Sequence, residues 1–274
     1  MSVRLFEGKA HAQSYWKYRI SPSQEIIDMI INFLHKHRSS PQELELAVDV
    51  GCGSGQGTVL LAPHFTRVVG TDVSPAQLEM ATQHATAHNI TYRESPAEQL
   101  PLEDASVDLV TAMSAFHWFD HAHFLQEADR VLKPRGCLAL LNYTLDMELS
   151  YPDADADTLN AICKELLAAL TPYWSPRQGT GSVDFYKEAY NTIAYPTKEW
   201  HESMWLKKTV PLSSFIGMIE SFSPYQAMLQ QHPEKAKHLS HDITHRLMKT
   251  MGVSSPDTEV LMSVRYYCML ACKP

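Results

Sequence analysis

The sequence contains few cysteines, and their spacing suggests neither a metal site nor a disulfide framework. Five cysteines stand at irregular intervals among 274 residues, and no Cys-x-x-Cys pair occurs. Free cysteines of this kind are typical of a reducing compartment. The sequence also lacks an apolar run long enough to cross a bilayer and an N-terminal apolar segment that would direct secretion. We therefore expect a cytoplasmic protein that has no membrane partner.

Basic residues are also scarce relative to acidic ones. The chain has 23 Lys and Arg against 31 Asp and Glu, which gives a formal net charge of −8. Proteins that bind nucleic acid usually neutralise phosphates with a basic patch, so nucleic acid is not expected as a partner. Hydrophobic residues make up 45% of the chain, which is enough for a sizeable core. The length suits one domain with an inserted or appended cap.

Strand-like and helix-like segments alternate over the first half of the chain. Strands are expected at 45–50, 67–73, from about 90, at 106–112 and at 137–142, with helices between them. Two segments, Ser21–Gln24 and Ser74–Gln77, have the Ser-Pro-x-Gln composition of a helix start. This alternation predicts an α/β fold with a doubly wound, mostly parallel sheet and helices on both faces.

The alternation weakens after about residue 145, where we expect a helical cap inserted between late strands. The expected segments are a helix at 159–170, a strand at 205–210, mostly helix at 213–250 and a final strand at 259–272. We divide the chain into an N-terminal lid and first helix (1–40), a ligand-binding core (41–146), a helical cap (147–202) and remaining core strands and helices (203–274).

The clearest mark of a ligand site is a loop with three glycines after the first expected strand. Gly51, Gly53 and Gly55 would let the backbone turn tightly and approach a ligand closely. Asp72 lies at the end of the next strand, where an acidic side chain can accept hydrogen bonds from ribose hydroxyls. No register of the loop fits the dinucleotide pattern G-x-G-x-x-G, and no P-loop is present. A nucleoside-containing ligand other than a dinucleotide is favoured over a ligand-free turn.

Residues 45–143 resemble Rossmann-type, class I S-adenosylmethionine methyltransferases. The matching segments are, in order, 46–55, 70–74, 95–102, 107–110, 115–119 and 127–136. The resemblance implies a Rossmann-like core, S-adenosylmethionine as cofactor, S-adenosylhomocysteine as product, and methyl transfer as the activity. It implies no metal, and the spacing of His117, His121 and His123 fits no metal-site pattern.

The same resemblance implies a set of cofactor-binding residues. They are Asp49, Gly51, Cys52, Gly53, Ser54, Gly55, Asp72, Val73, Gln77, Pro96, Ala97, Glu98, Ser114, Ala115 and Tyr18. Asp49 would organise the loop near the cofactor's amino group, and Asp72 would hold the ribose. Many relatives carry an aspartate where this chain has Pro96. Adenine recognition would therefore rest on the backbone at Ala97, with Glu98 nearby.

A second resemblance covers the two ends of the chain. Residues 6–19 resemble the N-terminal lid of the branch that contains trans-aconitate and cantharidin methyltransferases, and residues 221–226 resemble a late segment of that branch. Its known members act on small molecules, and several esterify carboxylic acids. The resemblance thus implies a small-molecule acceptor and O-methylation of a carboxylate. A carboxylate is ionised near neutral pH and needs no general base, whereas a phenol or an amine does.

Candidate acceptor-binding residues lie in the lid, after the fourth strand and in the cap. They are Tyr15, Arg19, His117, Trp118, Trp174, Trp205 and Tyr225. His117 could serve as a general base or only shape the pocket. Tyr15 or Tyr18 could place a ring near the sulfonium, and Arg19 could pair with an acidic acceptor. Each aromatic residue could equally belong to the core.

The sequence therefore predicts an S-adenosylmethionine-dependent methyltransferase that acts on a small molecule, as a monomer or homodimer. Two alternatives remain open at this point. The first is a protein or RNA methyltransferase, although the chain has no appended basic domain and no Asn-Pro-Pro-Tyr motif. The second is a non-catalytic protein that binds S-adenosylmethionine, which the intact glycine loop and Asp72 disfavour.

Overall fold

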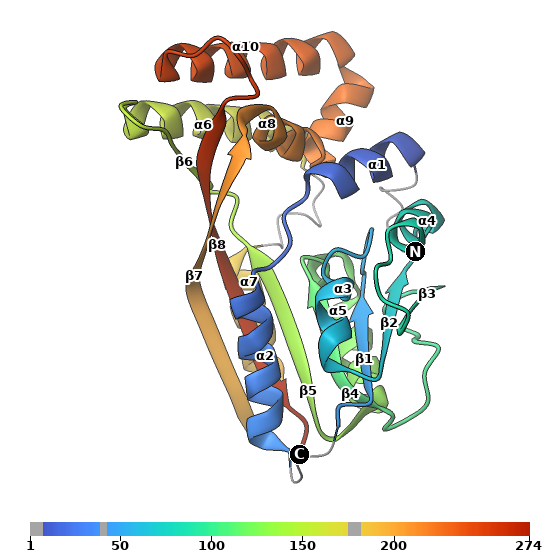
Figure 1. Ribbon diagram of the computed structural model, residues 1–274. Coiled ribbons are helices and arrows are strands. Elements are labelled where there is room, and N and C mark those ends of the chain that lie inside the picture. The colour runs from blue at the N-terminus through green and yellow to red at the C-terminus, as the bar shows by residue number, and fades with distance from the viewer. Residues whose placement is uncertain (1–7, 39–42, 175–181) are drawn as a thin grey trace.

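The computed structural model describes residues 8–38, 43–174 and 182–274, which form one sheet of eight strands with flanking helices (Figure 1). The strands are β1 (Leu46–Val50), β2 (Arg67–Asp72), β3 (Ile90–Glu94), β4 (Val107–Met113), β5 (Leu132–Tyr143), β6 (Glu148–Ser150), β7 (Thr197–Pro211) and β8 (Glu259–Cys272). The helices are α1 (Lys9–Tyr18), α2 (Gln24–His37), α3 (Thr58–Leu61), α4 (Pro75–Gln83), α5 (His121–Val131), α6 (Ala156–Leu170), α7 (Val183–Thr192), α8 (Leu212–Glu220), α9 (Ser223–Gln231) and α10 (Pro233–Met251). Short 3₁₀ turns are η1 (Ala62–His64), η2 (Phe116–Trp118) and η3 (Thr171–Tyr173). None of the described helices combines the length and apolarity that a membrane crossing requires.

The sheet is parallel over its first five strands and antiparallel at the end. Its order is β3-β2-β1-β4-β5-β8, and both β6 and β7 also pair with β8. β1 to β5 run parallel, whereas β8 is antiparallel to β5, β6 and β7. The predicted α/β, mostly parallel, Rossmann-like fold is thereby confirmed. The chain reverses its direction of travel across the sheet between β1 and β4, which is where open α/β sheets bind ligands.

Serine side chains begin the helices on either side of the glycine loop. The Ser74 side chain accepts the backbone N–H of Gln77, and Pro75 occupies the first position of α4, as the sequence predicts. The predicted start of α2 at Ser21 is wrong by two residues. Ser23 is the cap, because its hydroxyl rather than that of Ser21 accepts the N–H of Ile26.

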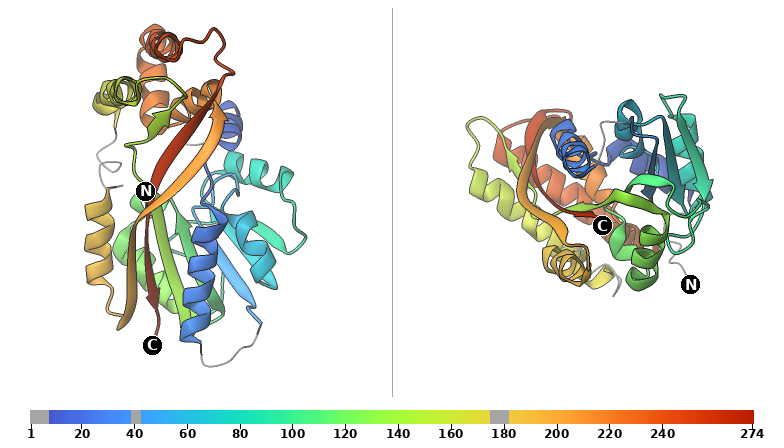
Figure 2. Two further views of the ribbon diagram at one scale, coloured as in Figure 1. Left: turned by 60° about the vertical axis from the view of Figure 1, so that its left-hand side comes forward. Right: turned by 90° about the horizontal axis from the view of Figure 1, so that it is seen from below.

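Helices cover both faces of the sheet, and each face has its own apolar cluster. α2 and α3 lie on one face, where Ile26, Ile27 and Ile30 are buried. α5 and α7 lie on the other (Figure 2), where the rings of Phe124 and Tyr186 are fully buried. Helices thus cover both faces of the parallel strands. The carboxyl ends of these strands lie together at one edge of the sheet.

A two-stranded ribbon carries the cap beyond this edge. β7 pairs with β8 along its whole length, whereas β5 pairs only with the second half of β8. The ribbon therefore rises above the core sheet and joins a layer of packed helices, α6, α8, α9 and α10 (Figure 1). The cap thus draws helices from both the 147–202 and the 203–274 segments, whereas α7 packs along β8 in the sheet domain.

Asp108 connects several segments at the amino-terminal ends of the parallel strands. Its buried carboxylate accepts the backbone N–H groups of Glu45 and Leu46 at 2.9 and 3.0 Å. The same carboxylate forms ion pairs with Arg38 at 3.3 Å and Lys133 at 3.2 Å. One side chain at the start of β4 thus joins the segment after α2, the entry to β1 and the start of β5.

We expect Asp108→Asn to lower the free energy of unfolding by about 3 kcal/mol, because it leaves two partly buried cations and two backbone N–H groups without the Asp108 carboxylate. Urea denaturation would measure the change. Asp104→Asn is the matched control, since the Asp104 side chain is 79% exposed in its pair with Arg130 and should contribute less than about 1 kcal/mol. Equal effects of the two substitutions would contradict the assignment.

Candidate functional site

Three adjoining pockets lie at the carboxyl edge of the parallel strands, below the cap and α1. The loop pocket is lined by Gly51, Gly53, Asp72, Gln77, Ala97 and Ala115, among others. The junction pocket is lined by Arg19, Asp49, Cys52, Gly57, Met113 and Tyr266, among others. The cap cavity, of about 430 Å³, is lined by Arg19, His117, Trp118, Tyr143, Trp174 and Phe222, among others. Tyr15 and Ser114 line all three, so the pockets form one continuous site.

The glycine loop adopts a conformation that requires glycine. Gly51 and Gly53 have φ angles of +67° and +54°, which residues other than glycine rarely adopt. A Cβ atom on Gly51 would lie 2.6 Å from the Cβ of Ala115, so the loop and the residue after β4 could not approach as they do. A Cβ atom on Gly53 would meet nothing closer than the Tyr15 ring at 3.5 Å. The loop therefore presents bare backbone to the loop pocket.

Asp72 fixes the glycine loop to the end of β2. Its carboxylate accepts the N–H of Gly53 and the N–H of Ser74, each at 2.9 Å. Burial raises the pKa of this carboxyl above its usual value, and the hydrogen bonds from Ser74 and Gly53 oppose that rise. Asp72 also lines the loop pocket, so it has both a structural partner and a face toward a ligand.

Asp49, at the end of β1, is held by two hydroxyl groups that the sequence analysis did not single out. Thr58 donates to one carboxylate oxygen at 2.6 Å, and Thr111 donates to the other at 2.8 Å. Burial raises the pKa of Asp49 to about 6, with these two hydrogen bonds acting in the opposite direction. The side chain is 1% exposed and lines the junction pocket.

The wall of the loop pocket beside Gly53 offers a hydrogen-bond acceptor, Gln77 Oε1, without a partner. Gln77 is 2% exposed, and its Oε1 atom makes no hydrogen bond. A buried polar atom of this kind usually finds a partner in a ligand or in ordered water. Together with the bare backbone at Gly53, it gives the loop pocket the polar groups that a nucleoside requires.

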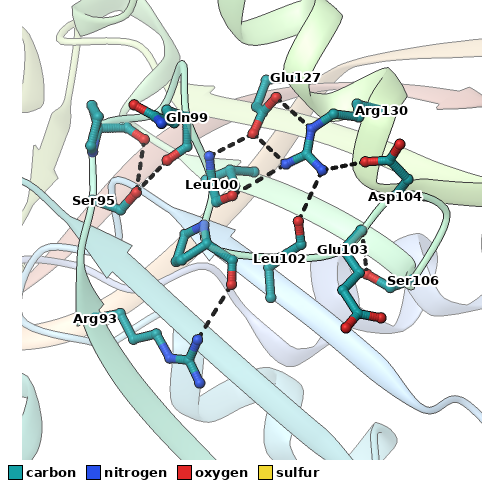
Figure 3. A network of polar contacts seen from close by, with 12 residues as sticks. Arg93, Ser95, Gln99, Leu100, Leu102, Glu103, Asp104, Ser106, Glu127 and Arg130 are labelled. Atoms are coloured by element: carbon teal, nitrogen blue, oxygen red, sulfur yellow. Dashed lines mark hydrogen bonds and ion pairs between the residues drawn. The ribbon is translucent and has the colours of Figure 1, made fainter.

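A salt-bridged network holds the segment that closes this pocket (Figure 3). Glu127 on α5 accepts the N–H of Leu100 at 2.6 Å and two hydrogen bonds from Arg130. Arg130 in turn donates to the carbonyl groups of Leu100 and Leu102. Ala97 and Glu98 line the loop pocket just before this anchored stretch, and Glu98 also accepts the N–H of Asp120, which caps α5, at 2.8 Å.

Arg19 lies where the junction pocket meets the cap cavity. Its guanidinium is stacked between the rings of Tyr15 and Phe222, at 4.4 and 4.6 Å from their centroids, and donates to the Tyr143 hydroxyl at 2.5 Å. The Nε atom is buried and has no hydrogen-bond partner. No acidic side chain of the described residues forms an ion pair with Arg19.

His117 lines the cap cavity as a neutral side chain. Burial lowers its pKa to about 3, and the nearby positive charge of Arg19 and the neighbouring His121 add to the effect. Its Nδ1 atom lies 3.4 Å from the hydroxyl of the buried Tyr186. A group with so low a pKa takes a proton poorly near neutral pH, which disfavours His117 as a general base.

Comparison with known proteins identifies the chemistry of this site. Residues 48–140 match the family model described as a methyltransferase domain. A Dictyostelium discoideum protein named for an inferred methyltransferase activity is 29% identical over 254 residues, which cover 91% of this chain and 88% of that protein. The chain is an S-adenosylmethionine-dependent methyltransferase. A Saccharomyces cerevisiae protein named for an inferred activity of the same kind is 25% identical and aligns over 81% of each chain.

Solved structures place the methyltransferase in the same fold. One solved structure is that of an Anaeromyxobacter dehalogenans protein that is described, by inference, as a type II methyltransferase. It superposes with a TM-score of 0.72 at 23% identity and covers 93% of this chain and 98% of that one. Phosphoethanolamine N-methyltransferase 2 of Haemonchus contortus, solved with S-adenosyl-L-methionine, gives a TM-score of 0.54 at 16% identity and covers 99% of this chain and 60% of that one. These likenesses establish the fold of the methyltransferase.

Most residues predicted to bind the cofactor meet at the loop and junction pockets. Those that line them are Asp49, Gly51, Cys52, Gly53, Asp72, Val73, Gln77, Ala97, Glu98, Ser114 and Ala115. Four predicted residues are placed elsewhere. Ser54 is buried against Gln56, Gly55 faces the Tyr92 hydroxyl, and Pro96 is exposed. Tyr18 packs on Gly217 of α8, because one face of α1 contacts the cap and only Tyr15 turns toward the glycine loop.

The predicted acceptor residues divide in the same way. Tyr15, Arg19, His117, Trp118 and Trp174 line the cap cavity. Trp205 is 44% exposed on β7, and Tyr225 is 4% exposed within the cap, where its hydroxyl donates to the Ala236 carbonyl at 3.2 Å.

Several residues that line the cap cavity escaped the sequence analysis. Asn142 and Tyr143 end β5, Tyr267 lies on β8, and Phe222 precedes α9. The end of β5 could have been inferred, since it neighbours the end of β4 in a parallel sheet. Tyr267 and Phe222 reach the site only through the antiparallel strand and the cap, which no local pattern reveals.

The two loop glycines give a matched pair of substitutions. Gly53→Ala should cost only the 1–2 kcal/mol of a left-handed backbone, because its Cβ would have space. Gly51→Ala adds a clash with Ala115 and should cost at least about 1 kcal/mol more. Urea denaturation of both variants measures the difference. A Gly51→Ala variant as stable as Gly53→Ala would show that the loop conformation is not the one described.

Proposed function

We propose that the methyltransferase methylates a carboxylate group of a small molecule bound in the cap cavity. The observation that carries this proposal is the composition of the cavity wall. Its described residues include one permanent cation, Arg19, and no group able to take up a proton near neutral pH. Such a wall suits an acceptor that is already an anion, because an anion binds to a cation and needs no general base to become reactive.

The loop and junction pockets fit S-adenosylmethionine, whose positively charged sulfur carries the methyl group. An acceptor oxygen would bond to this methyl group while the electron pair of the carbon–sulfur bond stays on the sulfur. We assign the ribose to Asp72 and the surroundings of the adenine to Val73, Gln77 and Ala97. Asp49 is assigned to the side of the amino group. The unpartnered Gln77 Oε1 and the bare backbone at Gly53 support this fit.

The protein's contribution is to orient the acceptor and exclude water. His117, with a pKa of about 3, and Tyr15, whose pKa is raised by burial, are poor proton acceptors at neutral pH. A carboxylic acid with a pKa near 4 is ionised without help, whereas a phenol or an amine would have to lose a proton to a base. The stacked guanidinium of Arg19 can orient the carboxylate toward Ser114, which lines all three pockets.

The proposal extends to the branch that contains trans-aconitate and cantharidin methyltransferases. The two segments that resemble this branch both reach the cap cavity, the first through Tyr15 and Arg19 and the second through Phe222 and Pro224. A monomer or homodimer in the cytoplasm, with no nucleic-acid or membrane partner, remains our expectation for the intact enzyme. No feature of the described residues favours a protein or RNA acceptor over a small molecule.

Arg19→Met should raise the acceptor KM by about 10- to 100-fold, because a charged hydrogen-bond partner of the carboxylate is lost. The dissociation constant of S-adenosylmethionine should change by less than about twofold. Lys17→Met on the exposed side of the same helix is the control and should change neither. If Arg19→Met weakens S-adenosylmethionine binding while the acceptor KM is unchanged, Arg19 serves the donor and the proposed role is wrong.

Binding of S-adenosylmethionine should depend on pH through Asp49. The pKa of about 6 means that the free protein keeps this carboxyl protonated below pH 6, where it offers no negative charge to a cationic ligand. Affinity should therefore rise about tenfold from pH 5 to pH 7 and level off above that. Calorimetric titration would show the slope, and Asp49→Asn should remove most of it. An unchanged slope in Asp49→Asn would assign the dependence to another group.

A further inference from the structure

We infer that the acceptor is a monocarboxylate whose remaining body is apolar and carries a flat ring. This inference rests on the proposed function and narrows it. It separates this enzyme from one that takes di- or tricarboxylates. The inference comes from the number of charges in the wall of the cap cavity, from the rings that form that wall and from the position of Arg19 within it.

The first observation is that the described wall of the cap cavity can neutralise one negative charge. Arg19 is its single permanent cation among the described residues, and His117 is neutral because its pKa is about 3. A second carboxylate on the acceptor would find no further cation among the described residues of this wall. Burying an unpaired carboxylate costs several kcal/mol, so a polycarboxylate should bind far more weakly than a monocarboxylate.

The second observation is that aromatic rings form much of the remaining wall. Trp118, Tyr143, Trp174, Phe222 and Tyr267 all line the cap cavity, from η2, β5, the end of the η3 turn, the start of α9 and β8. Rings from five different elements surround the space on several sides. A flat apolar group that stacks on such a wall gains stacking energy in addition to the energy from the apolar area that it buries.

Two of these rings, Tyr143 and Tyr267, are held in place by neighbouring side chains. The Tyr267 hydroxyl accepts a hydrogen bond from Asn142 Nδ2 at 3.0 Å. The Tyr267 ring packs edge-to-face on Tyr186 at 5.2 Å and stacks on Trp200 at 6.1 Å. The Tyr143 ring lies 5.5 Å from Tyr266. A wall fixed in this way favours a rigid ring over a flexible chain, because little side-chain freedom is lost on binding.

The third observation is the position of Arg19. Its guanidinium lies over the rings of Tyr15 and Phe222, at 4.4 and 4.6 Å from their centroids, so these rings limit the directions from which an anion can approach it. Arg19 and Ser114 both line the cap cavity and the junction pocket, so an anion held by Arg19 lies in the part of the site that these two pockets share. The anchored carboxylate and the methylated carboxylate are therefore the same group. One of its oxygens accepts from Arg19 while the other takes the methyl group, and no proton is released.

The test compares ligands that share one ring system. Naphthalene-2-carboxylate, naphthalene-2,6-dicarboxylate, 2-naphthol and 2-naphthylamine are offered with labelled S-adenosylmethionine at pH 7, with propane-1,2,3-tricarboxylate as a ring-free polyacid. We expect kcat/KM for the monocarboxylate to exceed that of either polyacid by at least about 100-fold. Calorimetry on the enzyme saturated with S-adenosylhomocysteine should show the same order of affinity.

The outcomes separate this inference from the proposed function. Equal or better use of either polyacid overturns the inference and leaves carboxylate methylation standing. Methylation of the naphthol or the amine in preference to every acid overturns the proposed function itself. Absence of naphthalene-2-carboxylate binding at millimolar concentration also overturns the inference, whether or not turnover is seen.

A second cation in the wall should weaken the preference for a monocarboxylate. Val183 lines the cap cavity at the start of α7 and is only partly buried, so a longer side chain can be accommodated there. Val183→Lys should raise the kcat/KM of the dicarboxylate, relative to the monocarboxylate, by at least about tenfold. Val183→Met is the control for side-chain length and should leave the ratio unchanged. An unchanged ratio in Val183→Lys would mean that charge does not limit the choice of acceptor.

Discussion

The conformation of the glycine loop depends on two carboxylates that stand at the ends of neighbouring parallel strands. Asp49 ends β1 and is held by Thr58 and Thr111, while Asp72 ends β2 and accepts the N–H of Gly53. Burial raises the pKa of both, so these groups are costly to keep charged. The hydrogen bonds offset part of that cost. They also aim the bare backbone of the loop into the space between β1 and β4.

The acceptor side has the opposite electrostatic character. The wall of the cap cavity holds the cation Arg19 and the neutral His117, and its described residues include no carboxylate. The carboxylates Asp49 and Asp72 thus lie on the loop side, and the cation Arg19 lies where the cap cavity meets the junction pocket. Ser114 and Tyr15 contribute to both sides, since they line every pocket of the site.

The cap makes this separation possible. β7 and β8 extend beyond the core sheet as a ribbon, and α6 and α8 to α10 pack on its far end. α1 bridges the cap and α4, so one short helix contributes Tyr15 to the glycine loop and Tyr18 to the cap. The acceptor cavity is thus lined by residues that lie as far apart along the chain as Tyr15 and Tyr267.

The sequence by itself determined the core and the donor side of the site. Alternating strands and helices, the glycine loop and Asp72 are local patterns, and the parallel fold brings the ends of β1, β2 and β4 to one edge wherever those patterns occur. Only the tertiary structure decided the acceptor side. Phe222 and Tyr267 enter the cavity through long-range packing, whereas Trp205 and Tyr225 are turned away from it. An aromatic residue in a helix or strand has the same local pattern whether it faces a core or a cavity, because its orientation is set by what packs against it.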